Sequence, residues 1–451
     1  MNIINKQGYL RPLSAAMILC MYTATGYAEE WDGTALGFEA PQQGLMGNML
    51  GLRPDLKDAG FNFNLGYLSQ AATNIGGGYN HDRKVAYIDQ FALTFSQDLQ
   101  QLTGIPDAMI EGNIVNRNHN SNLTVDRLQN PGLPINDLAQ ESWGGQSITR
   151  LGWLTFSRSF FDQQLYWRVG MMNKVQTFDQ SIPCDFQMLT QCGGKSANAM
   201  LWNNWNVHSW GTTLAWRVNP ELTLKGGVME QNPRVAERNH AWSWSTRGSR
   251  GALFPLEAEL KTTLNQLPGV YNVGVLLTNA SQQHLSRGKS QPDGSTDPAG
   301  YRRYSSTGFI WASANQQVTR HQDDAQRGMS LSWSGSLSDH RSNRVQLSTA
   351  VSMRYRGMFD ARPEDWLGIG VSYIKMSRYA SEQLQFAVPQ GGMSGQPIAD
   401  LSHSVNAEIY YRIRAASWLE LQPDLQYWHN PGGDRNTQDG WVAGLKTVVT
   451  F

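Results

Sequence analysis

Hydrophobic and polar residues alternate along most of the chain between Phe61 and Phe451. The alternation comes in runs of about ten residues, separated by Gly, Asn, Asp and Pro. Successive side chains of a β-strand point to opposite faces, so each run predicts a strand with one apolar and one polar face. About sixteen such runs can be distinguished, an even number that is typical of a closed barrel in a membrane.

The final run, Trp441–Phe451, is the most informative of them. Its mostly apolar face carries an aromatic residue at each end, whereas Lys446 and Thr450 lie on the other face. In a soluble domain such a strand would be an exposed edge that invites aggregation. In a closed barrel in lipid it is paired on both sides, and its aromatic rings lie at the two membrane interfaces. The sequence therefore predicts an all-β fold, a transmembrane antiparallel β-barrel of about 16 strands in a bacterial outer membrane.

The composition agrees with a barrel and argues against other classes. Hydrophobic residues make up 40% of the chain and charged residues 16%, with 16 Trp and 16 Tyr. No stretch after the N-terminus approaches the roughly 18 apolar residues that a membrane helix needs. Lys plus Arg and Asp plus Glu each number 37, so the net charge favours neither nucleic acid nor an acidic partner.

The chain divides into three predicted regions. Residues 1–28 are typical of a secretory signal peptide, because Lys6 and Arg11 make its start basic and the small residues Gly26 and Ala28 suit the cleavage site. Residues 29–60 are expected to form a periplasmic N-terminal segment with a short helix, and residues 61–451 the barrel. Short connections such as 161–164 are expected on the periplasmic side, and the long polar ones, 281–306 and 380–403, on the outside. Residues 118–147 are a candidate for a loop folded into the lumen.

Two cysteines follow the signal peptide, Cys184 and Cys192. In an exported chain, two cysteines this close together favour a disulfide that closes a loop. A metal site is the weaker alternative, because neither His nor a third thiol lies in the same segment. We predict no metal and no cofactor.

If the apolar faces meet lipid, the opposite faces line the lumen and decide what passes. This assignment places Phe309 and Trp311 against lipid and turns arginines, carboxylates, amides and serines inward. A polar wall of mixed charge suits neutral sugars, whose hydroxyls accept hydrogen bonds from guanidinium groups and donate them to carboxylates. For each single residue, the alternative is that it merely hydrates the lumen. The candidates for pore lining or sugar contact are Glu111, Asn113, Arg117, Arg168, Trp202, Trp205, Arg217, Arg354, Glu408 and Arg412.

Trp202 and Trp205 belong to the cluster Trp202–Asn206, which combines two indole rings with three Asn. Such a cluster can form a platform on which sugar rings stack, with amides for the hydroxyls. It can equally be part of an aromatic girdle at the membrane interface.

Many segments of the mature chain resemble the carbohydrate-selective porins of the OprB family. The matching segments include 58–63, 74–78, 183–193, 230–233, 251–257, 359–363, 422–427 and 442–445. The resemblance implies an outer-membrane barrel through which monosaccharides diffuse, and a bond between Cys184 and Cys192. It also implies an eyelet of arginines and an acid, for which Arg117, Arg168 and Glu111 are the candidates. One departure concerns how the periplasmic segment docks: residues 47–51 replace the Gly-Asp-Trp-Gly-Gly that is usual in the family.

The favoured function is passive, selective diffusion of carbohydrates such as glucose into the periplasm. The alternative is a general diffusion porin without strong sugar preference. An outer-membrane hydrolase that uses His208 or His403, and a secreted lectin, are less favoured, so we expect no enzyme. The expected partners are small carbohydrates, outer-membrane lipid and, through Phe451, the barrel-assembly machinery, with no nucleic acid. The sequence is compatible with a homotrimer or a monomer.

Overall fold

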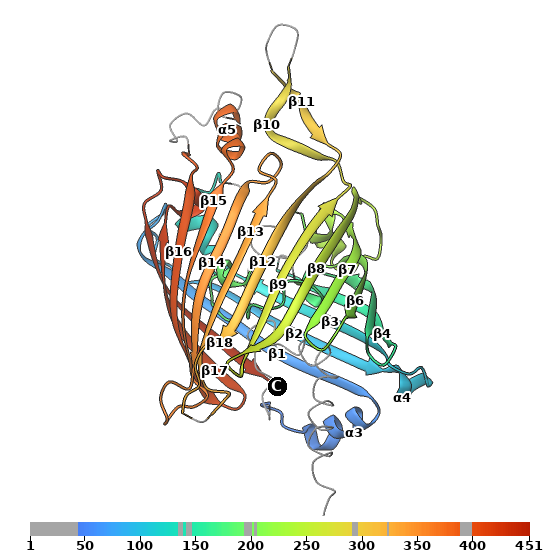
Figure 1. Cartoon of the computed structure of the whole chain (residues 1–451). Helices are drawn as coiled ribbons and strands as arrows, with labels where there is room; N and C mark the ends of the chain where they lie inside the picture. The colour runs from blue at the N-terminus through green and yellow to red at the C-terminus, as the bar shows by residue number, and fades with distance from the viewer. Residues whose placement is uncertain are drawn as a thin grey trace, which may run out of the picture.

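The computed structural model describes residues 44–133, 139–140, 147–193, 201–202, 205–290, 296–322, 324–387 and 399–451. Sixteen of the described strands form one closed antiparallel barrel, in which β1 pairs with both β2 and β18 (Figure 1). The barrel strands are β1 (Phe61–Gly77), β2 (Ala86–Asp98), β3 (Ala108–His119), β4 (Thr149–Phe160), β5 (Leu165–Met172), β6 (Ser209–Arg217), β7 (Leu222–Gln231), β8 (Gly251–Leu264), β9 (Leu267–Thr278), β12 (Thr307–Gln317), β13 (Gly328–Ser338), β14 (Val345–Arg356), β15 (Trp366–Met376), β16 (His403–Ala416), β17 (Leu419–His429) and β18 (Gly440–Thr450). The predicted fold class is confirmed.

Period-two alternation separates the two faces of the barrel as predicted. In β18, Leu445 is 42% exposed on the outer surface, whereas the adjacent Lys446 is 1% exposed inside. In β13, Leu331 and Trp333 are exposed outside, while Ser332, Ser334 and Ser336 are buried inside. Because each strand is hydrogen-bonded on both sides, the closed barrel presents no free edge to the lipid.

The prediction for β12 is wrong. Phe309 and Trp311 are only 5% and 3% exposed and face the lumen, whereas Ile310 between them is 52% exposed on the outside. Large apolar residues occupy both faces of this strand, so the alternation alone could not show which face meets lipid. The inward rings pack in an apolar cluster inside the barrel, which also contains Phe178 and Trp202.

The two ends of the barrel carry different structures (Figure 1). At the end with the long connections, β10 (Gln282–Ser290) pairs with β11 (Thr296–Tyr304) in a separate hairpin, and α5 (Arg378–Ala387) follows β15. Both lie in stretches that the sequence predicted to be polar loops. At the opposite end lie α3 (Leu52–Asp58), the turn helix α4 (Leu99–Thr103) and the C-terminus. Among the described residues, no helix is both long and apolar enough to cross a membrane.

The N-terminal arm, residues 44–60, contacts the end of the last strand. The backbone N–H of Leu45 donates to the Thr450 carbonyl at 2.8 Å, and Arg53 Nη2 donates to the Phe451 carbonyl oxygen at 2.8 Å. Helix α3 ends before Gly60, whose φ of +79° is a left-handed conformation that glycine adopts without strain. The arm therefore joins the two strands that close the barrel, β1 and β18.

Candidate functional site

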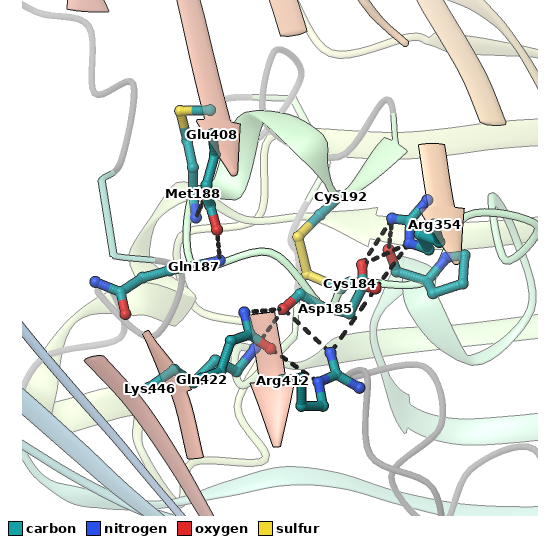
Figure 2. The surroundings of a disulfide bond; sticks show 11 residues. Cys184, Asp185, Gln187, Met188, Cys192, Arg354, Glu408, Arg412, Gln422 and Lys446 are labelled. Atoms are coloured by element: carbon teal, nitrogen blue, oxygen red, sulfur yellow. Dashed lines mark hydrogen bonds and ion pairs between the residues drawn. A yellow bond between two sulfur atoms is a disulfide. The ribbon is translucent and has the colours of Figure 1, made fainter. Parts of the chain in front are cut away.

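The connection after β5 folds into the barrel rather than away from it. Its first part, residues 173–193, is called the inner loop below and contains the short helices η4 (Lys174–Gln176) and η5 (Leu189–Gln191). A disulfide joins Cys184 to Cys192 near the tip of this loop (Figure 2). The predicted pairing of these cysteines is confirmed, and it makes the tip a closed ring.

The start of the inner loop follows the barrel wall across several strands. Arg168 Nη1 on β5 donates to the Gln176 carbonyl at 2.8 Å. Further along, the backbone N–H of Asp179 donates to Glu257 Oε2 on β8 at 2.8 Å. The Ser181 hydroxyl lies 2.6 Å from the Ser313 hydroxyl on β12. Each contact carries the loop further from the strand where it began.

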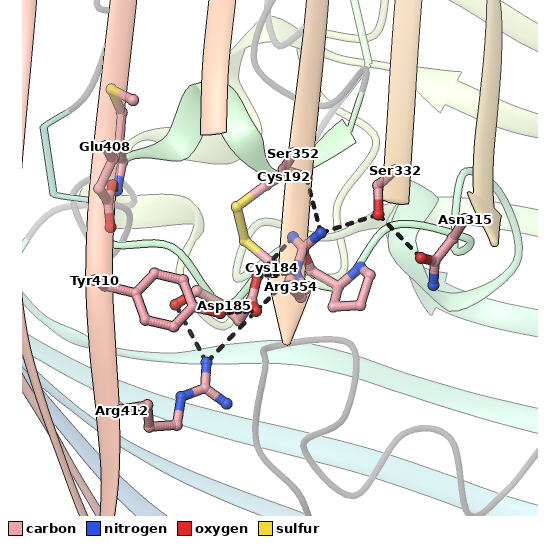
Figure 3. Close-up of polar contacts among 12 residues, drawn as sticks. Cys184, Asp185, Cys192, Asn315, Ser332, Ser352, Arg354, Glu408, Tyr410 and Arg412 are labelled. Atoms are coloured by element: carbon pink, nitrogen blue, oxygen red, sulfur yellow. Dashed lines mark hydrogen bonds and ion pairs between the residues drawn. A yellow bond between two sulfur atoms is a disulfide. The ribbon is translucent and has the colours of Figure 1, made fainter. Parts of the chain in front are cut away.

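The tip of the inner loop is bound to the opposite wall through the Asp185 carboxylate (Figure 3). Arg354 on β14 donates to it from Nε at 2.7 Å and from Nη2 at 2.6 Å, and the Tyr410 hydroxyl on β16 donates at 2.5 Å. Arg412 Nη2 lies 3.8 Å from the same carboxylate. Burial alone would raise the pKa of Asp185, but the two guanidinium groups and the Tyr410 hydroxyl lower it to about 2. Asp185 is therefore an anion at physiological pH.

Backbone groups of the tip are bound as well (Figure 2). The Asp185 carbonyl accepts from Gln422 Nε2 on β17 at 2.9 Å and from Lys446 Nζ on β18 at 3.2 Å. Glu408 on β16 accepts from the N–H groups of Gln187 and Met188 at 2.8 and 2.7 Å. Because β16–β18 lie across the closed barrel from β5 and β6, the inner loop spans the lumen and narrows it.

The connection between β3 and β4 also contributes described residues to the interior. Leu128 and Ala139 pack against Met188 of the inner loop and against Trp428. Gln426 Nε2 donates to the Ala139 carbonyl at 3.0 Å. These contacts agree with the expectation that this segment folds into the lumen, and they support the tip of the inner loop from a second side.

Polar groups on β3, β4 and β5 form a hydrogen-bonded cluster around Glu111. Arg168 Nη2 lies 2.9 Å from Glu111 Oε2, and both side chains are buried. The Ser157 and Tyr166 hydroxyls donate to the same oxygen at 3.0 and 3.2 Å. The negative charge of Glu111 is thus offset by one cation and distributed over three donors.

A second group of candidates gathers around Trp205. Its indole N–H donates to Asn113 Oδ1 at 3.2 Å. The Arg117 guanidinium lies 5.1 Å from the centre of the Trp205 ring, close enough for a cation–π interaction, while its Nε donates to Gln90 Oε1 at 2.7 Å. Trp205 therefore joins the wall of β2 and β3 to the segment that leads into β6.

Trp202 does not fit either interpretation of its cluster. It is 1% exposed, so no sugar can stack on its ring, and it lies inside the barrel rather than in an interfacial girdle. Its ring packs against Phe178 and Trp311 at centroid distances of 5.2 and 5.7 Å. The adjacent Asn residues made the cluster look like a sugar platform, but Trp202 is part of the apolar packing that holds the loop to β12.

Comparison with known proteins decides the family. Residues 82–451 match the family described as carbohydrate-selective porin, OprB family. The chain belongs to this family. Porin B of Pseudomonas aeruginosa is 32% identical over 428 residues, which cover 92% of this chain and 93% of that protein. The putative porin QuiX of Acinetobacter baylyi is 30% identical over 424 residues, 91% of this chain and 93% of that one.

A solved structure gives the same answer. The high-pH structure of Pseudomonas putida OprB matches with a TM-score of 0.86 at 32% identity, covering 92% of this chain and 100% of that one. The molecule is therefore a carbohydrate-selective porin of the bacterial outer membrane, and the family is one of channels rather than enzymes.

Apart from Trp202, which belongs to the apolar cluster, the predicted site residues of this porin lie in three places. On the wall formed by β3–β5 the structure brings together Glu111 with Arg168, and Asn113 with Arg117 and Trp205. On the opposite wall, Arg354, Glu408 and Arg412 hold the tip of the inner loop. Arg217 stands apart, at the end of β6 that meets the short turn 218–221.

Two residues of the tip anchor were missed by the sequence reasoning. Tyr410 could have been found, because Glu408 and Arg412 were assigned to the lumen and a residue two positions from each must share their face. Asp185 could not have been found by this rule, since it lies in a loop without regular alternation. Its position between the two cysteines of the closed ring was the only signal.

Proposed function

We propose that this porin lets monosaccharides such as glucose diffuse passively into the periplasm, and that the inner loop sets the size limit. The observation that carries the proposal is the path of the loop. It leaves β5, crosses the lumen and is bound on β14 and β16–β18 through Asp185 and Glu408. A solute has to pass through the space that the loop leaves free, so its size and shape decide the rate.

The charges near this passage are balanced locally, which suits a neutral solute. Glu111 faces Arg168, and Asp185 faces Arg354. Glu257 and Glu259 lie 3.1 and 2.6 Å from Lys225 Nζ, and Glu259 also lies 3.6 Å from Lys261 Nζ. Paired charges produce a weak field at a distance but still offer hydrogen bonds at close range. A sugar hydroxyl is able to use such groups, and a simple ion gains little from them.

Aromatic surface in the same region supports a sugar rather than an arbitrary polar solute. Trp205 is only partly buried and lies beside Arg117, and Tyr166 lines the lumen beside Glu111. The apolar face of a pyranose packs on such rings while its hydroxyls reach the neighbouring polar groups. We therefore keep Glu111, Arg117 and Trp205 as the proposed sugar contacts. Arg168 is 1% exposed, and we propose that it positions Glu111 instead.

Liposome swelling tests the proposal. Proteoliposomes that contain the purified porin should swell faster with glucose than with a disaccharide, and faster than with a neutral amino acid of similar size. Arg117→Gln should reduce the preference for glucose over the amino acid, whereas Arg320→Gln, in an exposed periplasmic loop, should not. Equal rates for the sugar and the amino acid in the wild-type protein would contradict selectivity and favour a general diffusion porin.

A further inference from the structure

A cavity of about 690 Å³ lies at the periplasmic end of the lumen. Its wall comes from the inner faces of β1–β7, including Glu111 at its inner limit, and from the N-terminal arm with Lys57 of α3. The volume falls within the range of about 300–1,000 Å³ that is usual for small-molecule sites. A solute that has passed the inner loop reaches this cavity before it enters the periplasm.

The acidic groups of the cavity are already engaged. Glu111 is paired with Arg168, Asp98 Oδ1 accepts from the Gln100 backbone N–H at 2.8 Å, and Asp107 Oδ1 accepts from Gln163 Nε2 at 2.8 Å. Each carboxylate therefore has a donor of its own, although the amide donors leave the negative charges of Asp98 and Asp107 in place.

Two cations of the cavity have no such partner. Within the described part of the chain, neither the Arg217 guanidinium nor the Lys57 ammonium group makes a hydrogen bond or an ion pair. Arg217 is only partly exposed. Because the preceding Trp216 faces outward, alternation along β6 turns the Arg217 side chain inward. The cavity thus holds two cations that no described acid contacts, whereas the arginines at the inner loop pair directly with carboxylates.

We propose that this cavity is a second ligand site of the porin, and that it retains sugars that carry a carboxylate, the sugar acids. The Arg217 guanidinium would take the carboxylate through two parallel N–H···O bonds, the geometry that suits this pair of groups. The Ser96 and Ser159 hydroxyls of the same wall offer hydrogen bonds to the sugar hydroxyls. The inference rests on the proposed function, because it assumes that sugars cross the lumen.

The physical consequence is a difference between the two sections of the passage. At the inner loop, a neutral sugar and its acid meet paired charges and differ little. In the cavity, the carboxylate of the acid can bind the Arg217 guanidinium, which no described carboxylate contacts, so the acid stays longer there. The attraction acts between partly solvated groups, and added salt should weaken it.

The test uses the full mature porin inserted in one orientation in a planar bilayer. D-gluconate or D-glucose is added on the periplasmic side, and the ion current through single channels is recorded. We expect gluconate to reduce the current at a concentration at least fivefold lower than glucose, with the difference shrinking as KCl is raised. Arg217→Gln should remove the preference for gluconate, and Arg217→Lys should keep part of it.

A matched control is Arg356→Gln, which removes another arginine at the periplasmic end of a strand but not from the wall of the cavity. It should leave the preference for gluconate unchanged. Retained heat-modifiable migration in gels shows that each variant forms the barrel.

Two results would overturn the inference, and they differ in what they say about the proposed function. If gluconate and glucose reduce the wild-type current equally, or if Arg217→Gln keeps the preference, the second site is refuted while sugar passage stands. If neither sugar affects the current from either side, both the site and the sugar function fail.

Discussion

Replacing Asp185 with Asn should release the tip of the inner loop from the opposite wall. The substitution keeps the size of the side chain but removes the charge that faces Arg354 and Arg412. Both guanidinium groups are buried in a region that water reaches poorly. Arg354 would lose the carboxylate that it binds, while Arg412 would keep Glu420, whose carboxylate oxygen lies 3.9 Å from its Nε. Breaking a buried ion pair in this way costs about 3–5 kcal/mol.

The extent to which the tip is released depends on the free energy that is lost and on the contacts that remain. A loss of about 3 kcal/mol changes the ratio of bound to released tip by more than 100-fold, because each 1.4 kcal/mol is a factor of ten. The hydrogen bonds from Gln187 and Met188 to Glu408 remain and keep part of the attachment. We therefore expect a loop that detaches transiently, rather than an unfolded barrel.

Single-channel recording and liposome swelling measure this directly. Asp185→Asn should show current steps to a larger conductance, and disaccharides should enter liposomes faster relative to glucose. The control is Asp360→Asn, which breaks the ion pair of an exposed acid with Arg327. Exposed pairs contribute only about 0–1 kcal/mol, so this variant should behave like the wild type.

The pH dependence gives a second test of the same anchor. The pKa of Asp185 is lowered from 3.8 to about 2 when the tip is bound, so the charged carboxylate stabilises the bound tip fully at any pH above its ordinary pKa of 3.8. That stabilisation is lost as the pH falls from about 4 towards 2. The wild-type current should therefore stay constant from neutral pH to about pH 4 and resemble that of Asp185→Asn near pH 2. An Asp185→Asn barrel with unchanged conductance and unchanged sugar preference would refute the role of this anchor.

Three further predictions concern stability. Replacing Cys184 and Cys192 with Ser should remove roughly 2–3 kcal/mol of constraint on the inner loop and speed hydrogen exchange of its amides, whereas exchange in the strands should not change. Trp311→Ala should lower the free energy of unfolding by about 3–5 kcal/mol, and the midpoint of thermal unfolding with it, because it leaves a cavity in the apolar cluster inside the barrel. Trp216→Ala, on the lipid face, should lower the free energy of unfolding clearly less. An equal decrease in the two variants would contradict the inward position of Trp311. Arg53→Ala should speed unfolding in hot detergent, because it removes a hydrogen bond worth about 1.5–3 kcal/mol at the junction of the first and last strands. Arg53→Lys should restore part of the unfolding half-life.

The sequence by itself determined the architecture, because the period of two is a local property of every strand. Leu445 lies on the outer surface and Lys446 inside the barrel, in the order that their positions predicted. The cysteine pair was equally predictable, since only two cysteines follow the signal peptide and they are close together in an exported chain. Neither inference needed knowledge of which strands lie opposite one another.

The tertiary structure alone decided what fills the barrel. Asp185 and Trp202 lie in segments with no alternation, so their partners on β14, β16 and β12 depend on how a loop crosses the lumen. Trp311 turned inward because packing against that loop outweighed the apolar pattern of its own strand. Alternation along its strand assigned Arg217 to the lumen. Only the folded structure, in which seven strands and the N-terminal arm surround one cavity, shows that no described acid contacts its guanidinium. Alternation assigns a side chain to a face, whereas its partners depend on residues that are distant in the chain and meet only in the folded barrel.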